Sequence, residues 1–216
     1  MKTYRLEEEQ VYSTQQREVS RPQVYSTYLD RCGNRQNRES KPSKQSPINR
    51  LVYKKQNLIR NGDFSHWKNQ DQPKFWQGKN ITQTSTSKTG AKAVQLNQIT
   101  DGESKNGSQL WQKGECCSNI KVNLQFSIAT LIIDSSKPLP CNPEITVELN
   151  WLDSKGDKLD TGLEFIIPAD SIPAAQWTFF SRVSSAAPQG TEGFLLLFAV
   201  DAGTPVALDN LNLITL

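Results

Sequence analysis

The distribution of aromatic residues divides this sequence into two parts that cannot fold in the same way. Residues 1–56 contain no Phe, Trp or Ala but hold all five tyrosines, whereas residues 57–216 hold all five tryptophans and all eight phenylalanines. A segment this polar buries too little apolar surface to offset its chain entropy, while roughly 150 residues are enough to form a core. We therefore predict an extended N-terminal arm, residues 1–56, and one folded domain, residues 57–216.

Charge follows the same division. Residues 1–60 carry 13 Lys and Arg against 6 Asp and Glu, a net charge of +7, whereas residues 61–216 carry 12 against 16, a net charge of −4. The arm is therefore basic and the domain acidic. Opposite charges on two parts of one chain favour contacts between copies of that chain.

The domain sequence consists of short apolar stretches separated by turn residues. Val122, Leu124, Phe126 and Ile128 alternate with polar residues, which is the pattern of a half-buried strand. No long stretch keeps a helical period. The pattern predicts an all-β fold, an antiparallel β-sandwich of the jelly-roll type. The expected strands are Ile81–Ser85, Ala91–Asn97, Ser108–Gln112, Ile120–Thr130, Glu144–Leu152, Lys158–Ile167, Ala175–Val183, Glu192–Val200 and Val206–Leu213.

Three motifs of the domain resemble a known family. The sequence opens with Asn-Leu-Ile-Arg-Asn-Gly-Asp-Phe-Ser-His-Trp at residues 57–67, continues with Pro-Lys-Phe-Trp at 73–76, and closes with Val-Ala-Leu-Asp-Asn-Leu-Asn-Leu at 206–213. In this order they resemble the galactose-binding-like jelly-roll domains. That superfamily includes carbohydrate-binding modules of bacterial glycanases and domains of collagen-like surface proteins of spore-forming bacteria. The resemblance covers residues 57–216 and none of the arm.

The resemblance implies a calcium site and a sugar site, each with a structural alternative. Many carbohydrate-binding members bind calcium through a Glu near the first motif and an Asp of the last strand. Here the Asp is Asp209, but Ser65 replaces the Glu and Asp63 is the nearest carboxylate, so a hydrogen-bonded turn without metal is the alternative. For the sugar site, Trp111 is the candidate exposed ring. Core positions are expected for the other tryptophans that we considered, Trp76, Trp151 and Trp177.

The residues needed for catalysis are not arranged in any motif that we recognise. Asp153, Asp157 and Asp160 crowd one predicted hairpin, where charges usually solvate a turn, and His66 has no serine or cysteine nucleophile in a known elbow. We predict that the protein is not an enzyme and needs no cofactor, calcium excepted.

Neither nucleic acid nor membrane is an expected partner. The positive charge of the arm is diluted by Gln, Ser and the glutamates Glu7–Glu9, unlike a phosphate-binding segment. The longest apolar run, Phe194–Val200, is too short to span a bilayer, and the chain opens without the apolar segment of a signal peptide.

The arm contains one internal repeat, Val-Tyr-Ser-Thr, at residues 11–14 and again at 24–27. These residues favour extended backbone, and an extended segment can add to the edge of another sheet. We expect the arm to join neighbouring copies of the chain; an unstructured tail is the alternative. The candidate assembly residues are Val11, Tyr12, Val24, Tyr25 and Tyr28.

The cysteines, Cys32, Cys116, Cys117 and Cys141, match no zinc-binding spacing. We predict that at least one forms a disulfide between subunits after assembly, with Cys32 the best candidate because it lies in the arm. Four reduced thiols remain the alternative.

Together these features predict a non-catalytic structural protein that assembles with copies of itself into a surface layer or fibre. Its domain resembles extracellular modules although no export signal is evident, and spore-surface proteins are made in the mother-cell cytoplasm before lysis exposes them. We therefore expect a spore or cell surface; a phage structural protein fits the same features. The alternative function is a carbohydrate-binding module with polysaccharide as its partner.

Overall fold

The structure is a computed structural model that describes residues 55–90, 92–97, 107–132 and 142–216. The predicted arm residues Val11, Tyr12, Val24, Tyr25 and Tyr28 lie outside the described residues, as do Cys32 and Cys141. None of the described residues belongs to a helix long and apolar enough to cross a membrane.

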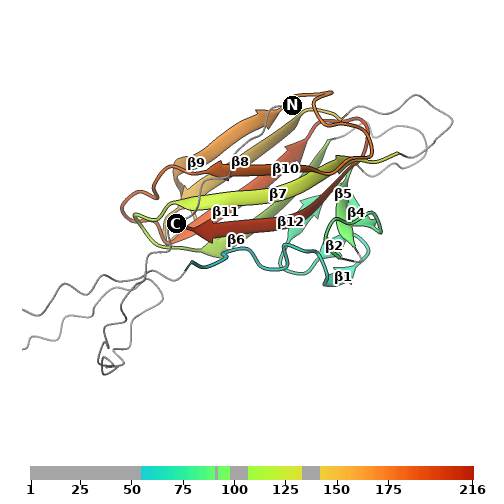
Figure 1. The fold of residues 1–216 in the computed structure, drawn as a ribbon. Helices are drawn as coiled ribbons and strands as arrows, with labels where there is room; N and C mark the ends of the chain where they lie inside the picture. Colours follow the sequence, from blue (N-terminus) through green and yellow to red (C-terminus); the bar gives the residue numbers. More distant parts are fainter. Residues whose placement is uncertain (1–54, 91, 98–106, 133–141) are drawn as a thin grey trace, which may run out of the picture. The chain divides into compact units, whose positions relative to one another are not determined.

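Two antiparallel five-stranded sheets pack face to face as a β-sandwich (Figure 1). The β12 sheet has the strand order β10-β7-β12-β5-β4, and the β11 sheet has the order β3-β6-β11-β8-β9; β1 and β2 form a separate hairpin. This confirms the predicted all-β jelly roll. The strands are β1 Trp67–Asn69, β2 Gln72–Pro73, β3 Gln77–Lys79, β4 Ile81–Thr84, β5 Ala93–Leu96, β6 Ser108–Glu115, β7 Val122–Thr130, β8 Ile145–Leu152, β9 Lys158–Ile167, β10 Thr178–Val183, β11 Gly193–Val200 and β12 Val206–Thr215.

Alternation along the central strands produces the core. In β7, the predicted inward residues Val122, Leu124, Phe126 and Ile128 are fully buried. The Phe126 ring stacks on Phe180 of the neighbouring strand β10 at a centroid distance of 5.1 Å, and the rings of Phe165 and Phe198 pack against it from the opposite sheet. Because aromatic rings bury large areas, these contacts hold the two sheets together at their centre.

The two ends of the domain pair with each other. The N–H of Leu58 donates to the Leu213 carbonyl at 2.8 Å, and the N–H of Leu211 donates to the Gly62 carbonyl at 2.9 Å. Gly62 must be a glycine, because a Cβ at this position would clash with the Leu211 carbonyl oxygen. The opening motif of the domain is therefore held against its last strand.

Trp177 is a correction to the predicted core. It is half-buried and lies before β10, outside the cluster of core residues. The predicted strand began at Ala175, but Ala175 has φ of 57° and the N–H of Gln176 donates to the Pro173 carbonyl, so a turn precedes the strand. Trp177 therefore falls on the same side of the sheet as the exposed Phe179, and not on the inward side with Phe180. Trp76 and Trp151 are buried as expected.

The packing around Phe126 gives a prediction about stability. Replacing Phe126 by Ala removes a fully buried ring and should lower the free energy of unfolding by about 3–5 kcal/mol. The half-buried Trp177 is the matched control, and Trp177→Ala should lower it by less than half as much. Urea titration measures both; equal losses would show that the strand phase around β10 is misassigned.

Candidate functional site: a polar groove beside Trp111

Trp111 lies on the outward face of the β11 sheet. In β6 its neighbours Leu110 and Gln112 point inward and are buried, whereas Trp111 is half-buried at the surface. Gln77 of β3 is directly opposite in the register, and the indole Nε1 donates a hydrogen bond of 2.9 Å to Gln77 Oε1. The edge of the ring is thus fixed by its cross-strand neighbour.

The space beside this ring is an open groove of about 420 Å³, a size within the usual range of ligand sites. Its walls come from the β1–β2 hairpin, from β3 and from β6. Besides Trp111, the lining residues are Asn69, Asp71, Gln72, Gln77 and Gly78. Apart from the ring and the glycine, every wall residue carries an amide or a carboxylate.

The hairpin wall is fixed by Asn61 of the opening motif. Asn61 has φ of 55°, and its Nδ2 donates to the carbonyls of His66 at 2.8 Å and Lys74 at 3.0 Å. Its Oδ1 accepts from the N–H of His66 at 3.0 Å. One side chain therefore joins the start and the end of the segment that contains β1 and β2.

A buried glutamine fixes the same motif to β6. Gln112 Oε1 accepts from the N–H of Arg60 and its Nε2 donates to the Arg60 carbonyl, both at 2.9 Å. The indole N–H of buried Trp76 also donates to the Arg60 carbonyl, at 3.1 Å. These contacts hold the groove walls in place before any ligand is present.

A second exposed ring lies close in sequence to the groove. Phe75, two residues before Gln77, is 47% exposed and has φ of 72°, a conformation that bulky residues rarely adopt. The Arg60 guanidinium carbon and Lys74 Nζ lie 5.6 and 5.2 Å from its ring centroid. Neither cation has an ion-pair partner among the described residues.

Beyond the groove, a row of side chains crosses the outward face of the β11 sheet. The register places Trp111 opposite Leu197 of β11, Leu197 opposite Glu148 of β8, and Glu148 opposite Glu164 of β9. With Gln77 on β3, this row spans all five strands, a width of about 19 Å at the usual strand spacing. The face therefore offers an apolar centre with polar groups at both ends.

The residues around Asp209 do not fit a calcium site. This fully buried carboxylate accepts hydrogen bonds on Oδ2 from the N–H of Lys88 at 2.7 Å, the N–H of Thr89 at 3.0 Å and Ser87 Oγ at 2.9 Å. Its Oδ1 accepts from the N–H of Asn210 at 2.7 Å. Donors of this kind satisfy an anion and leave no lone pairs directed at a cation.

Asp63 does not complete a metal site either. Its Oδ1 accepts from the N–H of Ser65 at 3.3 Å, and Ser65 Oγ lies 3.1 Å from Asp63 Oδ1 and 2.8 Å from His66 Nδ1. Within the described ranges, no three side chains of His, Cys, Asp or Glu come together. The serine lies between the acid and the histidine, whereas in a catalytic triad the histidine lies between the other two.

The adjacent cysteines differ in their surroundings. Cys116 is buried, and burial raises the pKa of its thiol to about 12. Because the thiolate is the reactive form, Cys116 is inert at neutral pH. Cys117 is half-buried. The predicted disulfide between subunits stays a prediction, since Cys32 and Cys141 are not described.

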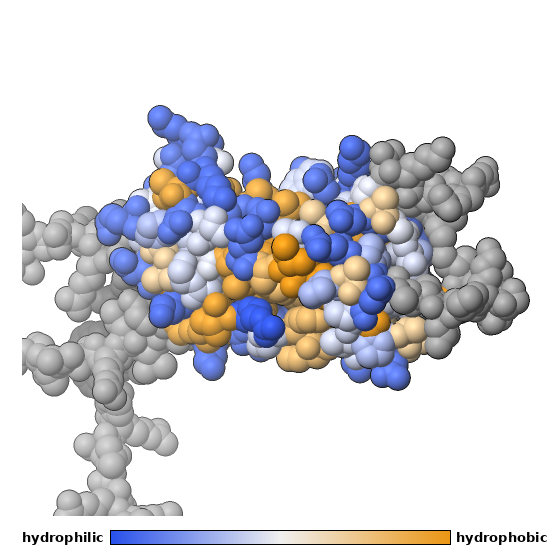
Figure 2. All heavy atoms as spheres, turned by 90° about the horizontal axis from the view of Figure 1, so that it is seen from above, coloured by the Kyte–Doolittle hydropathy of each residue, from blue (hydrophilic) through white to orange (hydrophobic). Residues whose placement is uncertain are grey.

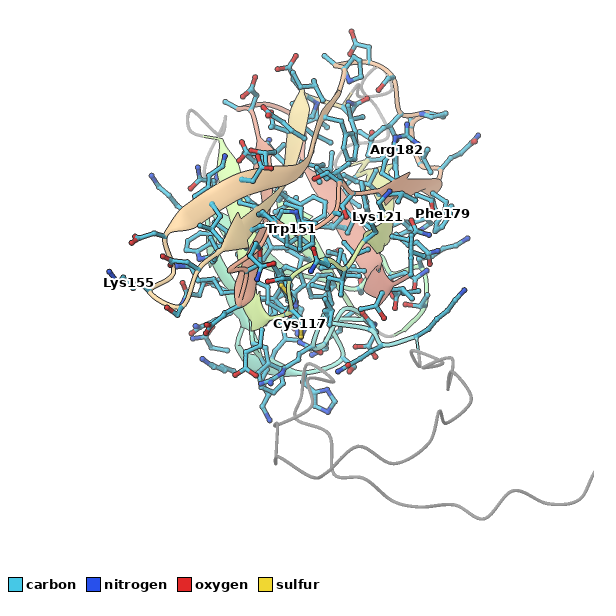
Figure 3. The ribbon with its side chains drawn as sticks, turned by 90° about the vertical axis from the view of Figure 1, so that its left-hand side faces the viewer. Cys117, Lys121, Trp151, Lys155, Phe179 and Arg182 are labelled. Carbon is cyan, nitrogen blue, oxygen red and sulfur yellow. The ribbon has the colours of Figure 1, made fainter. Side chains whose placement is uncertain are left out.

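Sequence reasoning identified Trp111 but missed the rest of the groove. The strands β1, β2 and β3 contain only two or three residues each, too few to show alternation. The turn residues around Asn69 and Asp71 were the only indication of a hairpin here. Trp151, for which a core position was expected, lies inside the sandwich (Figure 3). Its Nε1 would be 2.6 Å from a Cβ at Gly162.

The fold is similar to several solved jelly-roll structures. The enzymatically active domain of tailspike protein 4 from bacteriophage CBA120 matches with 15% identity and a TM-score of 0.51, over 73% of this chain and 21% of that chain. The CBM22-1 xylan-binding domain of Paenibacillus barcinonensis Xyn10C matches with 14% identity and a TM-score of 0.45, over 71% and 91%. TmCBM61, in complex with β-1,4-galactotriose, matches with 13% identity and a TM-score of 0.46, over 73% and 97%.

These similarities concern the fold alone, a jelly-roll β-sandwich of the kind that the three motifs predicted. The chain spans about a fifth of the length of the tailspike chain. No protein-family model matches the sequence, and no curated protein matches it.

The contacts of Asp209 give a prediction that separates a hydrogen-bonded turn from a metal site. Asp209→Ala leaves buried N–H groups without an acceptor and should lower the free energy of unfolding by roughly 3–5 kcal/mol. EDTA should leave the urea midpoint of the unaltered protein unchanged. A midpoint that falls with EDTA and recovers with calcium would instead establish a cation at this carboxylate.

Proposed function

We propose that the domain is a non-catalytic module that binds polysaccharide in the groove beside Trp111. The observation that carries this proposal is the outward indole ring, fixed by Gln77 and surrounded by amide and carboxylate side chains. An aromatic face packs against the apolar C–H face of a sugar ring, while amides and carboxylates bond its hydroxyl groups.

The rigidity of the walls supports this function. Gln112 and Asn61 hold the opening motif through side-chain hydrogen bonds to its backbone, so little order has to be gained when a ligand binds. A preformed site keeps more of its interaction energy as affinity.

The length of the surface indicates an oligosaccharide rather than a single sugar. The row from Gln77 through Trp111 and Leu197 to Glu148 continues the groove across the β11 sheet. Asn150 Nδ2 donates to Glu148 Oε2 at 3.2 Å, which orients the acceptor at the far end. A glycan chain lying across the strands would contact the ring at one end and these polar groups at the other.

Affinity electrophoresis of the purified chain in gels that contain polysaccharide tests this proposal. Xylan and β-1,4-galactan belong in the panel because ligands of these kinds are named for domains of similar fold. Polygalacturonate, whose sugars carry carboxylates, also belongs in the panel. Arg60 and Lys74 flank the exposed Phe75 ring and could bind these carboxylates, since neither has a carboxylate partner among the described residues. At least one polysaccharide should retard the chain.

Replacing Trp111 by Ala should weaken this binding at least about tenfold, equivalent to 1.4 kcal/mol, because the stacking surface is removed. Isothermal titration with an oligosaccharide of the retarding polymer measures the loss. Phe179→Ala is the matched control, since Phe179 is an exposed ring on the other sheet, and it should bind as the unaltered protein does. Full affinity in the Trp111 variant would place the site elsewhere.

The second candidate function is self-assembly through the N-terminal arm at a spore or cell surface. The features that favour it are the Val-Tyr-Ser-Thr repeat and the net charges of +7 on residues 1–60 and −4 on residues 61–216. Assembly and glycan binding are compatible, because a layer of repeated copies would bind a polymer at several points and gain avidity.

Deleting residues 1–56 should abolish assembly and leave the domain folded. The core and the pairing of Leu58 with β12 both lie beyond the deletion. Sedimentation velocity would measure particle size, and circular dichroism would report the strands. Particles of unchanged size after the deletion would contradict this second function.

A further inference from the structure

The four edge strands of the sandwich differ in how well they are protected against pairing with another chain. At three edges the structure has a device that prevents strand addition. β3 and β4 have only three and four residues. β9 is long, but its register with β8 shifts twice, and it carries the exposed charges of Lys158, Asp160 and Glu164.

The remaining edge, β10, is longer than β3 and β4, and its single charged residue is the exposed Arg182. All six of its residues pair with β7 without a register shift. Its outward face presents Phe179, 58% exposed, and Val183, 55% exposed, with Ser181 between them. Figure 3 shows Phe179 and Arg182 at the outside of the ribbon. Despite the charge of Arg182, a regular strand whose residues Phe179, Ser181 and Val183 are uncharged is the kind of edge to which another strand adds.

The inner side of β10 is firmly packed. The Phe180 ring stacks on Phe126 at 5.1 Å. The exposed Arg182 reaches over β9, where its guanidinium carbon lies 5.6 Å from the centroid of the Phe165 ring. Figure 2 views the molecule from the side where β9 and β10 lie in Figure 1, and it shows apolar surface in the middle of this face. The edge is therefore preformed, with an apolar surface beside it.

We propose that β10 is the acceptor site for the N-terminal arm of a second copy, which adds one Val-Tyr-Ser-Thr segment as a further strand. This rests on the second function proposed above, assembly through the arm. In an extended segment, Val and Ser lie on one side and Tyr and Thr on the other. Each side therefore combines one apolar and one hydroxyl residue, the same mixture that Phe179, Ser181 and Val183 present on β10.

The size of the repeat favours a second copy as the source of this strand. The two segments, 11–14 and 24–27, contain eight residues in all, whereas β10 has six. The two segments therefore cannot both pair in full with one β10 edge. The other edges of the same sandwich are short, or shifted and charged, whereas a second sandwich provides another β10.

Length and charge allow this arrangement. The segment at residues 24–27 lies 29 residues before Gln56, where the described chain joins β12. Such a length extends on the order of 95 Å, well beyond one domain of this size. The net charges of the arm and the domain attract one copy to another.

The test uses the full chain with two lysines on the outward face of β10. Phe179→Lys together with Val183→Lys should reduce particles to monomers at concentrations at least tenfold above those at which the unaltered chain assembles, as measured by sedimentation velocity. Ile166→Lys is the matched control: Ile166 is 54% exposed on the edge strand β9, and this variant should assemble normally. Assembly of the β10 variant at unaltered concentrations, or equal loss in both variants, overturns the proposal.

Cross-linking distinguishes the source of the strand. Tyr12 or Tyr25 is replaced by p-benzoylphenylalanine in the full chain, and chains with ¹⁴N and ¹⁵N are mixed before irradiation. Cross-links from the arm of one isotope to residues 178–183 of the other support the proposal. Links only within one chain, links only to other strands, or no links overturn it. If deletion of the arm abolishes assembly while β10 receives no links, arm-driven assembly stands and only the acceptor site is wrong.

Discussion

The pairing of the opening motif with β12 is the constraint on which the rest of the domain depends. It joins residues separated by about 150 positions, through Leu58 and Leu213 and through Gly62 and Leu211. Asp209, in the same strand, is fully buried and is bound by the N–H groups of Lys88 and Thr89. A buried carboxylate is tolerated only when donors surround it, so the strand, the opening motif and the loop before β5 must come together as one unit.

This closure also determines the geometry of the groove. Once the opening motif is fixed to β12, its Arg60 backbone is bound by Gln112 from β6, the strand that carries Trp111. Its Asn61 side chain binds both ends of the β1–β2 segment. The residues of the opening motif are therefore structural, and the residues suited to a ligand lie next to them. Similar folds can consequently differ in what they bind.

Much of the fold could be predicted from sequence because short apolar stretches are separated by turn residues, and β7 alternates clearly between apolar and polar residues. β11 is instead a continuous apolar run. Trp111 was the candidate exposed ring, and the structure places it on the outward side of β6. The shortest strands, which show no clear alternation, could not be predicted. Asn69 and Gln72 belong to strands too short to show any pattern, and Asp71 lies in the turn between them. The turn at Ala175 leaves Trp177 before the start of β10. At Asp209 the motif identifies the carboxylate but not the donors around it, which favour the hydrogen-bonded turn over the calcium site.

The central claim is that a glycan binds against the Trp111 ring, and NMR titration of the ¹⁵N-labelled full chain tests it most directly. The titrant is an oligosaccharide of whichever polysaccharide retards the chain. The five tryptophans give separate indole N–H signals, and Trp111→Phe identifies the one of interest. We expect this signal to shift on titration together with the side-chain amides of Asn69, Gln72 and Gln77, while the signal of buried Trp151 stays in place. Shifts confined to other parts of the domain, with the Trp111 signal unmoved at saturation, would contradict the account.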